Sequence, residues 1–221
     1  MKIRAEHLTK TVSLPMAKTL TILQDVSLNI DTGDILGILG VSGSGKSTLL
    51  GLLAGLDLPT QGRVFWNDTS LNELNEDGRA RLRLHHAGFI FQNFELLPAY
   101  TALENVLLPL ELIGQTDATS KAKLCLKEVE LSARMHHYPN QLSGGEQQRV
   151  AIARAFAIQP SILFADEPTG NLDQKTGSHI IELLFELNQR HKTTLVFVTH
   201  DPTLSKICSK ILHLSEGKLE A

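Results

Sequence analysis

The sequence predicts an α/β fold in which a mainly parallel sheet is preceded by an antiparallel β layer and interrupted by a helical subdomain. Three observations support this prediction. Apolar runs typical of buried strands occur on both sides of residues 93–157, which contain only helix-period segments. The strand-like segments nearest the N-terminus follow one another without an intervening helix. With 221 residues, 42% of them hydrophobic, the chain can bury one substantial core.

The first 92 residues are expected to form strands and then alternating helices and strands. Alternating or clustered apolar residues predict strands at 3–8 and 19–30, and a turn leads from there into a buried strand at 35–39. A glycine-rich loop follows, and the next helix has an apolar face and ends at Gly55. Its apolar residues are Leu49, Leu50, Leu52 and Leu53. The elements expected after it are a turn at 58–62, a strand at 63–66, an Arg-rich helix at 76–86 and a strand at 88–91.

The rest of the chain is expected to be helical and then to return to alternation. The helices predicted in the insertion are 101–113, 118–129 and 146–157. The elements predicted after it are strands at 162–165, 194–198 and 211–214 and helix-period segments at 175–190 and 202–209.

The loop after strand 35–39 carries the pattern Gly-x-x-x-x-Gly-Lys-Ser. Its backbone N–H groups and the positive end of the following helix predict a phosphate cradle. Lys46 is expected to reach the β and γ phosphates of a nucleoside triphosphate, and Ser47 to bind Mg²⁺. The predicted nucleotide-binding residues of this loop are Gly40, Val41, Ser42, Gly43, Ser44, Gly45, Lys46, Ser47 and Thr48.

Polar residues follow three further predicted strands, where ligands bind in open α/β sheets. Asp166 and Glu167 follow strand 162–165; Asp166 is expected to hold Mg²⁺, and Glu167 to polarise a water that attacks the γ phosphate. His200 follows a strand and is expected to face phosphate. Gln92 follows strand 88–91, and its amide is expected to complete the Mg²⁺ coordination or to orient water. The predicted catalytic residues are therefore Glu167, His200 and Gln92, and the predicted metal ligands are Ser47, Gln92 and Asp166.

A second anion site is predicted at Ser143, Gly144 and Gly145, which are expected to precede the helix 146–157. Two anion sites on one chain can fold together, or each can serve the nucleotide of a second copy across a two-fold interface. The residues by themselves leave both arrangements open.

The charge, the cysteines and the length of the uncharged runs limit which ligands, cell compartments and membrane spans are expected. A net charge of −3 and the absence of a Lys/Arg run make nucleic acid an unexpected ligand. Cys125 and Cys208 lack the CxxC spacing and are expected to be reduced, buried thiols of a cytosolic protein. No uncharged run reaches the length of about 18 residues that a membrane span needs.

The stretch Leu142–Arg149 reads Leu-Ser-Gly-Gly-Glu-Gln-Gln-Arg, and together with the phosphate loop it resembles the ATP-binding subunits of ABC transporters over residues 3–219. The resemblance implies a P-loop NTPase core of the RecA-like type, with 1–92 and 158–221 forming the catalytic core and 93–157 the helical subdomain of one domain, 1–221. It also implies that 40–48 is the Walker A loop, Gln92 the Q-loop and 171–173 the D-loop. In this family two copies bind two ATP with Mg²⁺ head to tail, and each signature loop caps the γ phosphate of its partner.

Three segments, 91–98, 101–106 and 165–173, resemble the lipoprotein-releasing and macrolide-export branch, and the chain is most similar to its YbbA type. This resemblance implies a cytoplasmic ATPase, peripheral on the inner face of the cell (inner) membrane, that drives an integral membrane permease. The apolar residues of 94–100 suggest a groove for a permease helix. The sequence does not identify the transported substrate or the permease.

One residue departs from the family pattern. The family has an adenine-stacking aromatic near position 12, where this chain has Val12, and no aromatic residue precedes Phe65. A lost base–aromatic contact costs about 1–3 kcal/mol, so we expect weaker discrimination between bases with phosphate binding intact.

Two alternative classes share the same site chemistry. The ATPases of DNA repair and translation act on nucleic acid or ribosomes, but they carry long coiled coils or a second ATPase domain, and this chain has neither. A regulatory subunit without activity would be expected to lack Glu167 or His200, and both are present.

Overall fold

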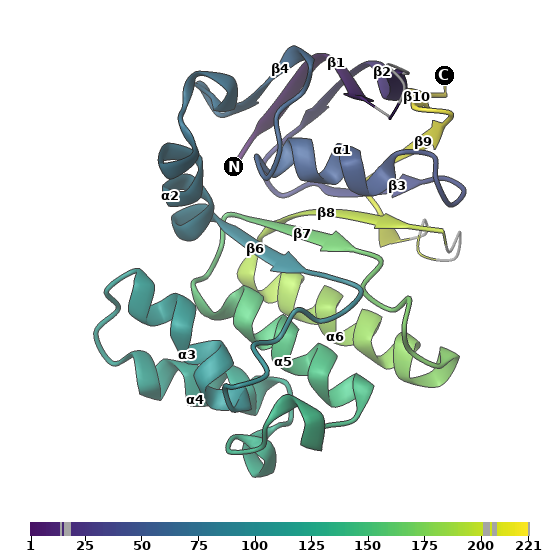
Figure 1. The fold of residues 1–221 in the computed structure, drawn as a ribbon. Helices are drawn as coiled ribbons and strands as arrows, with labels where there is room; N and C mark the ends of the chain where they lie inside the picture. Colours follow the sequence, from purple (N-terminus) through teal and green to yellow (C-terminus); the bar gives the residue numbers. More distant parts are fainter. Residues whose placement is uncertain (14, 16–18, 201–203, 205–206, 221) are drawn as a thin grey trace. The chain divides into compact units, whose positions relative to one another are not determined.

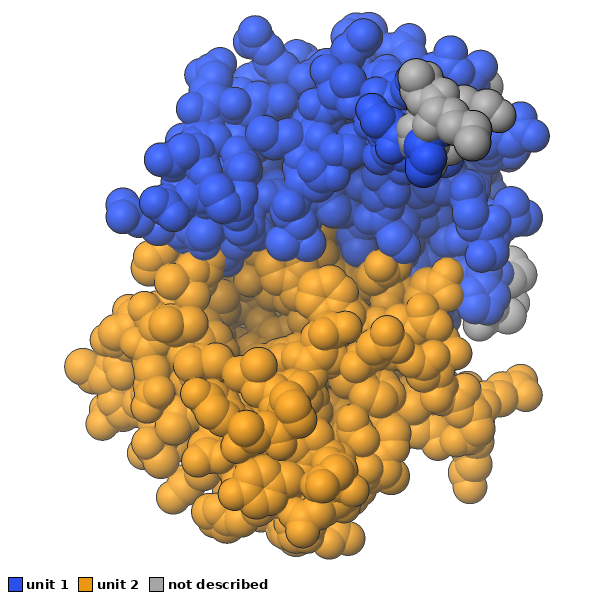
Figure 2. All heavy atoms as spheres, viewed as in Figure 1, with its two compact units in different colours: residues 1–83, 194–221 blue, residues 84–193 orange. Residues whose placement is uncertain are grey.

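The protein is described here by a computed structural model that covers residues 1–13, 15, 19–200, 204 and 207–220. The chain forms two compact units, shown in blue and orange in Figure 2. Unit 1 contains residues 1–83 and 194–221, and unit 2 contains residues 84–193. The boundaries expected for a catalytic core and a helical subdomain stay a prediction.

Unit 1 begins with an antiparallel sheet of four strands in the order β2-β1-β4-β5. Their bounds are Ile3–Ser13 for β1, Thr19–Ile30 for β2, Gln61–Trp66 for β4 and Thr69–Ser70 for β5. Ile3 lies opposite Ile30 on one side and Trp66 on the other, and all three side chains are buried. The predicted antiparallel layer is therefore confirmed.

The second sheet of unit 1 contains the strand that leads into the glycine-rich loop (Figure 1). β3 (Ile35–Leu39) is parallel to β8 (Thr194–Thr199) and to β9 (Lys210–Ser215), and β10 (Lys218–Leu219) is antiparallel to β9. All six residues of β8 are buried, as is typical of a parallel strand inside an α/β fold.

Helix α1 (Lys46–Leu53) follows the loop, and its predicted apolar face is buried. The indole N–H of Trp66 in β4 donates to the carbonyl of Leu53 at 2.8 Å, which joins the antiparallel layer to this helix. Unit 1 also holds the short helix η2 (Leu71–Glu73) and most of α2 (Glu76–His86).

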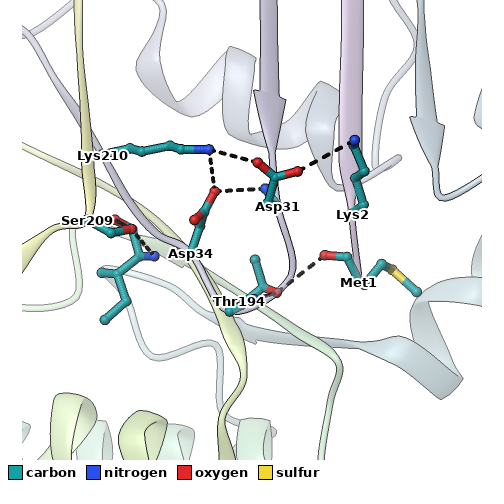
Figure 3. Close-up of polar contacts among 9 residues, drawn as sticks. Met1, Lys2, Asp31, Asp34, Thr194, Ser209 and Lys210 are labelled. Atoms are coloured by element: carbon teal, nitrogen blue, oxygen red, sulfur yellow. Dashed lines mark hydrogen bonds and ion pairs between the residues drawn. The ribbon is translucent and has the colours of Figure 1, made fainter.

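A charged cluster fixes the turn that leads into β3 (Figure 3). The ammonium of Lys210 lies 3.1 Å from the carboxylate of Asp31 and 2.7 Å from that of Asp34, and the ammonium of Lys2 lies 3.5 Å from Asp31. The Asp34 carboxylate also accepts the N–H of Asp31 at 2.7 Å. Exposed ion pairs contribute at most about 1 kcal/mol each, so the cluster mainly aligns the ends of β1, β2, β3 and β9.

Unit 2 contains two parallel strands and the helices that follow each of them in the chain. Its elements are β6 (Ala87–Ile90), α3 (Ala102–Leu112), α4 (Ala118–Glu128), η3 (Ser132–Arg134), η4 (Pro139–Gln141), α5 (Gly144–Ala157), β7 (Ile162–Asp166) and α6 (Gln174–His191). The ring of Phe89 in β6 stacks on that of Phe164 in β7, with centroids 5.6 Å apart. The predicted run of helices within 93–157 is confirmed.

Several expectations need correction. Helix α5 begins at Gly144, two residues before its predicted start, because the Ser143 side chain caps it there. Asp166 is the last residue of β7 instead of following the strand. Both cysteines are free, but they are half-buried instead of buried, and burial raises the pKa of the Cys125 thiol to about 11. Half of the predicted helix-period segment 202–209 lies outside the described residues.

Candidate functional site

The phosphate loop of unit 1 leads directly from β3 into α1. Gly45 precedes the helix with a φ of 102°, a left-handed conformation that favours glycine, and no side chain caps the helix. The first turn of α1 also contains no acidic residue. The first-turn N–H groups of a helix lack intrahelical acceptors, so this helix end is positive and suited to an anion.

The Lys46 side chain lies against its own loop. Its ammonium donates to the carbonyls of Gly40 at 2.9 Å and Val41 at 3.0 Å, and the side chain is buried. The hydroxyl oxygen of Ser44 is also buried and has no hydrogen-bond partner among the described residues. An orphaned hydroxyl and a buried ammonium in one loop can both donate hydrogen bonds to a polyanion.

Strand register places His200 beside this loop. Leu39, the last residue of β3, is the Cα partner of Thr199, the last residue of β8. The phosphate loop and His200 therefore leave unit 1 at the same sheet edge. The His200 side chain is exposed.

In unit 2 the strand register brings Gln92 and the two acids to one edge. Ile90 in β6 is the Cα partner of Ala165 in β7, so the chain segments with Gln92 and Asp166 leave the sheet side by side. Glu167 has a φ of 43°, in the left-handed region that is unusual for a residue with a side chain. Such backbone strain is frequent at functional sites.

The Gln92 side chain is engaged by the D-loop of the same unit. Its Nε2 donates to Oδ1 of Asn171 at 3.2 Å, and Nδ2 of Asn171 donates to the backbone carbonyl of Gln92 at 3.0 Å. Nδ2 of Asn171 also donates to Oδ1 of Asn93 at 2.8 Å.

The signature loop ends in a capping box at the start of α5. The Ser143 hydroxyl oxygen accepts the N–H of Glu146 at 3.3 Å, and the Glu146 carboxylate accepts the N–H of Ser143 at 2.8 Å. The pKa of Glu146 is lowered, chiefly by this backbone N–H and against the opposing effect of burial. Ser143 thus uses its oxygen as an acceptor, which leaves its hydroxyl proton available to a ligand.

Close packing requires glycine in this loop. A Cβ on Gly145 would lie 2.6 Å from Cγ2 of Thr176 in α6, and one on Gly144 would lie 3.3 Å from Cδ2 of Leu172. The D-loop and the start of α6 therefore pack directly against the signature residues within unit 2.

Sequence reasoning missed the contacts that Arg154 and Gln148 of α5 make with distant parts of the chain. Arg154 donates to the carbonyls of Phe94 at 2.9 Å and Glu95 at 2.5 Å, two residues with positive φ, and burial lowers the pKa of its guanidinium. Gln148 is buried and donates to the carbonyl of Pro168 at 2.6 Å. Neither partner is close in sequence, so helical periodicity indicates only that these residues belong to α5.

The predicted donors for Mg²⁺ are the Ser47 hydroxyl, the Gln92 amide oxygen and the Asp166 carboxylate. Hydroxyl, amide and carboxylate oxygens fit Mg²⁺, which binds few protein groups together with substrate phosphates. No cluster of three His, Cys, Asp or Glu side chains suited to a metal occurs in the described part of the chain. Among the same residues, no helix combines the length and the apolar character that crossing a membrane requires.

The sequence is similar to two groups of transporter subunits. It is 49% identical over 220 residues to the ABC transporter ATP-binding protein YbbA of Escherichia coli K12, covering 99% of this chain and 96% of that protein. It is 47% identical over 220 residues to the lipoprotein-releasing system ATP-binding protein LolD of Xylella fastidiosa strain Temecula1, covering 98% and 91%.

The fold matches a solved dimeric cassette. The structure of the ATP-binding cassette MJ0796 in a dimeric post-hydrolysis state with ADP and Pi superposes with a TM-score of 0.92 and 42% identity, covering 99% of this chain and 97% of that one. The profile of the ABC transporter family matches residues 23–170. The chain therefore belongs to the ABC transporter family, as one of its ATP-binding subunits.

Proposed function

We propose that this subunit forms a homodimer on binding two ATP, hydrolyses them and drives a permease of the lipoprotein-release type from the inner face of the membrane. The main support for a dimer is the capped start of α5. Its cap leaves the hydroxyl proton of Ser143 and the first-turn N–H groups of Gly144 and Gly145 for an acceptor outside the helix. The phosphate of a partner's nucleotide has the matching charge.

Each predicted site residue has a chemical task in this proposal. The loop 40–48 binds the triphosphate, with Lys46 offsetting the charge of the β and γ phosphates. Glu167 accepts a proton from the attacking water, and His200 donates a hydrogen bond to the γ phosphate. Ser47, Gln92 and Asp166 would hold Mg²⁺, which neutralises phosphate charge when bound.

Substitution of Glu167 by Gln tests the catalytic assignment. The amide keeps the shape of the side chain but cannot accept the proton, so we expect ATP-bound dimers to accumulate and turnover to fall by orders of magnitude. Size-exclusion chromatography with ATP and Mg²⁺, together with phosphate release, measures both. Hydrolysis near the wild-type rate would remove Glu167 from this role.

The permease is proposed to dock on the loop 94–100. Leu97 and Tyr100 expose 41% and 40% of their surface. The buried Asn105 accepts the N–H of Leu97 at 2.8 Å and donates to the carbonyls of Leu97 and Tyr100, while Arg154 holds the other end of the loop. Apolar side chains kept exposed by a satisfied, rigid backbone are typical of an interaction site.

Substitution of Leu97 and Tyr100 by Gln tests the docking surface. Phe94 is less suitable, because its ring lies near Gly144 at the start of α5. We expect loss of copurification with a permease that carries a large extracytoplasmic domain, co-expressed from the neighbouring gene. Leu112→Gln is the matched control, since Leu112 is 61% exposed at the far end of α3. Unchanged copurification of the double variant would contradict this docking site.

The effect of Val12 on base preference also stays a prediction. Val12 lies in β1 opposite Leu20 of β2, and Leu20 is 49% exposed. We expect the catalytic efficiencies with ATP and GTP to be similar, and a strong preference for ATP would contradict this expectation.

A further inference from the structure

The amides of Gln92 and Asn171 form a closed pair of hydrogen bonds. Asn171 donates from Nδ2 to the Gln92 backbone carbonyl at 3.0 Å, and Gln92 donates from Nε2 to Oδ1 of Asn171 at 3.2 Å. The two residues are 79 positions apart in the sequence, and both belong to unit 2.

This geometry fixes which way both amides point. A backbone carbonyl can only accept, so the group of Asn171 that faces it must be the NH₂ group. The oxygen Oδ1 of Asn171 therefore faces the Gln92 side chain, which must present its own NH₂ group in return. Oε1 of Gln92 is left on the opposite side, and no hydrogen bond to it is present within the described residues.

Gly170 provides the space for this arrangement. A Cβ at position 170 would lie 2.8 Å from Nε2 and 3.1 Å from Cδ of Gln92. The Gln92 amide therefore rests on the backbone of Gly170, directly before the D-loop.

The D-loop is in turn connected to the catalytic acid. The N–H of Gly170 donates to the carbonyl of Glu167 at 3.0 Å, and the N–H of Leu172 donates to the carbonyl of Thr169 at 3.0 Å. These turns place Asn171 at a fixed position relative to Glu167. The orientation of Gln92 is thus set by the chain segment that also carries the general base.

We propose that Asn171 is a positioning residue that presents Oε1 of Gln92 to Mg²⁺. This inference rests on the proposed role of Gln92 as a metal ligand. Without Asn171, the Gln92 amide would rotate freely and present NH₂, which cannot bind a cation, for part of the time. Partners that orient a metal ligand typically change metal affinity by about 10–100-fold.

The test uses the full chain and the non-hydrolysable analogue AMP-PNP. Its dissociation constant is measured by calorimetry with Mg²⁺ and with EDTA, and the ratio gives the metal-dependent gain in affinity. We expect Asn171→Ala to lower this gain by about tenfold, with the EDTA value unchanged within about twofold. Gly170→Ala pushes the Gln92 amide aside without removing Asn171, and should lower the gain similarly. Thermal unfolding without nucleotide confirms that both variants are folded.

Two further variants separate the possible outcomes. Asn93→Ala removes one acceptor of Asn171 but keeps its pair with Gln92, so the gain should stay at the wild-type value. In the double variant Gln92→Ala/Asn171→Ala, the loss should equal that of Gln92→Ala, because both act through one group.

A full metal-dependent gain in Asn171→Ala, together with a reduced gain in Gln92→Ala, would overturn the role of Asn171 and leave that of Gln92 standing. An unchanged gain in Gln92→Ala would instead overturn the proposed metal role of Gln92, and the role of Asn171 with it.

Discussion

The phosphate loop of unit 1 and the signature loop of unit 2 both lead from a glycine-rich segment into a helix, but they are closed by different means. The phosphate loop has a left-handed Gly45 before α1, no side-chain cap, and the Lys46 ammonium across its carbonyls. The signature loop has a capping box between Ser143 and Glu146, and its glycines lie within α5. No side chain caps the helix start of the first loop, whereas the second loop caps its helix with its own side chains.

This difference separates two functions of a helix N-terminus. An uncapped end next to a lysine can bind a triphosphate within one protomer. A capped end without a cation in its first turn is stable without ligand and has only a hydroxyl proton and two glycine N–H groups to offer. We therefore expect the first loop to determine nucleotide affinity and the second to determine dimerisation.

The largest expected effect is that of Lys46→Ala. This change removes the only cation of the phosphate loop, and we expect AMP-PNP binding to the protomer to fall below detection in calorimetry. Ser143→Ala should leave the same measurement unchanged. Equal affinity in wild type and Lys46→Ala would contradict the phosphate-cradle assignment.

The second prediction concerns Ser143→Ala combined with Glu167→Gln. Loss of the hydroxyl proton should weaken the ATP-induced dimer by tenfold or more, about 1.4 kcal/mol, as measured by light scattering against concentration. Thr101→Ala is the matched control, because Thr101 and Glu104 form the same capping box at α3. Each change should cost about 1 kcal/mol of stability as a lost cap. If Thr101→Ala weakens the dimer as strongly, the effect reflects stability alone.

The third prediction concerns Gly145→Ala. We expect it to lower the free energy of unfolding by less than Lys46→Ala lowers the free energy of AMP-PNP binding. The new methyl group would meet Thr176 at 2.6 Å, and such overpacking typically costs about 1–3 kcal/mol of unfolding free energy. Denaturant unfolding measures the loss. Thr176→Ser, which removes the opposing methyl group, should restore most of it. Gly144→Ala should cost less, because its nearest contact is at 3.3 Å. If Thr176→Ser does not restore the stability of Gly145→Ala, the strain does not arise from the contact with Thr176.

The smallest expected effect is the pH dependence of the α5 cap. Because the folded state lowers the pKa of Glu146, the cap stabilises the helix fully above the ordinary carboxyl pKa, near 4.5, and this stabilisation is lost as the pH falls through the lowered value. Amide exchange at the start of α5 should therefore accelerate as the pH falls through the lowered pKa of Glu146. Glu146→Gln should remove this dependence. If amide exchange in Glu146→Gln depends on pH as it does in the wild type, Glu146 is not the titrating group.

Much of the fold could be predicted because periodicity and turn residues are local. The strands β2 and β3 and the helix α2 have the bounds expected from the sequence, and both strands are apolar runs that end at a turn or loop containing Gly. The start of α5 was placed too late, because glycine lowers helix propensity, although Ser143 and Glu146 have the Ser-x-x-Glu spacing of a capping box.

The sequence by itself determined the phosphate loop, the acids at the end of β7 and the family, because these signals depend on residue types at fixed short spacings. Only the tertiary structure decided that Asn171 orients Gln92, that Arg154 holds the loop of Phe94 and Glu95, and that Thr176 requires glycine at position 145. These contacts join residues far apart in the chain. They depend on hydrogen-bond direction and atomic packing, which no local sequence pattern encodes.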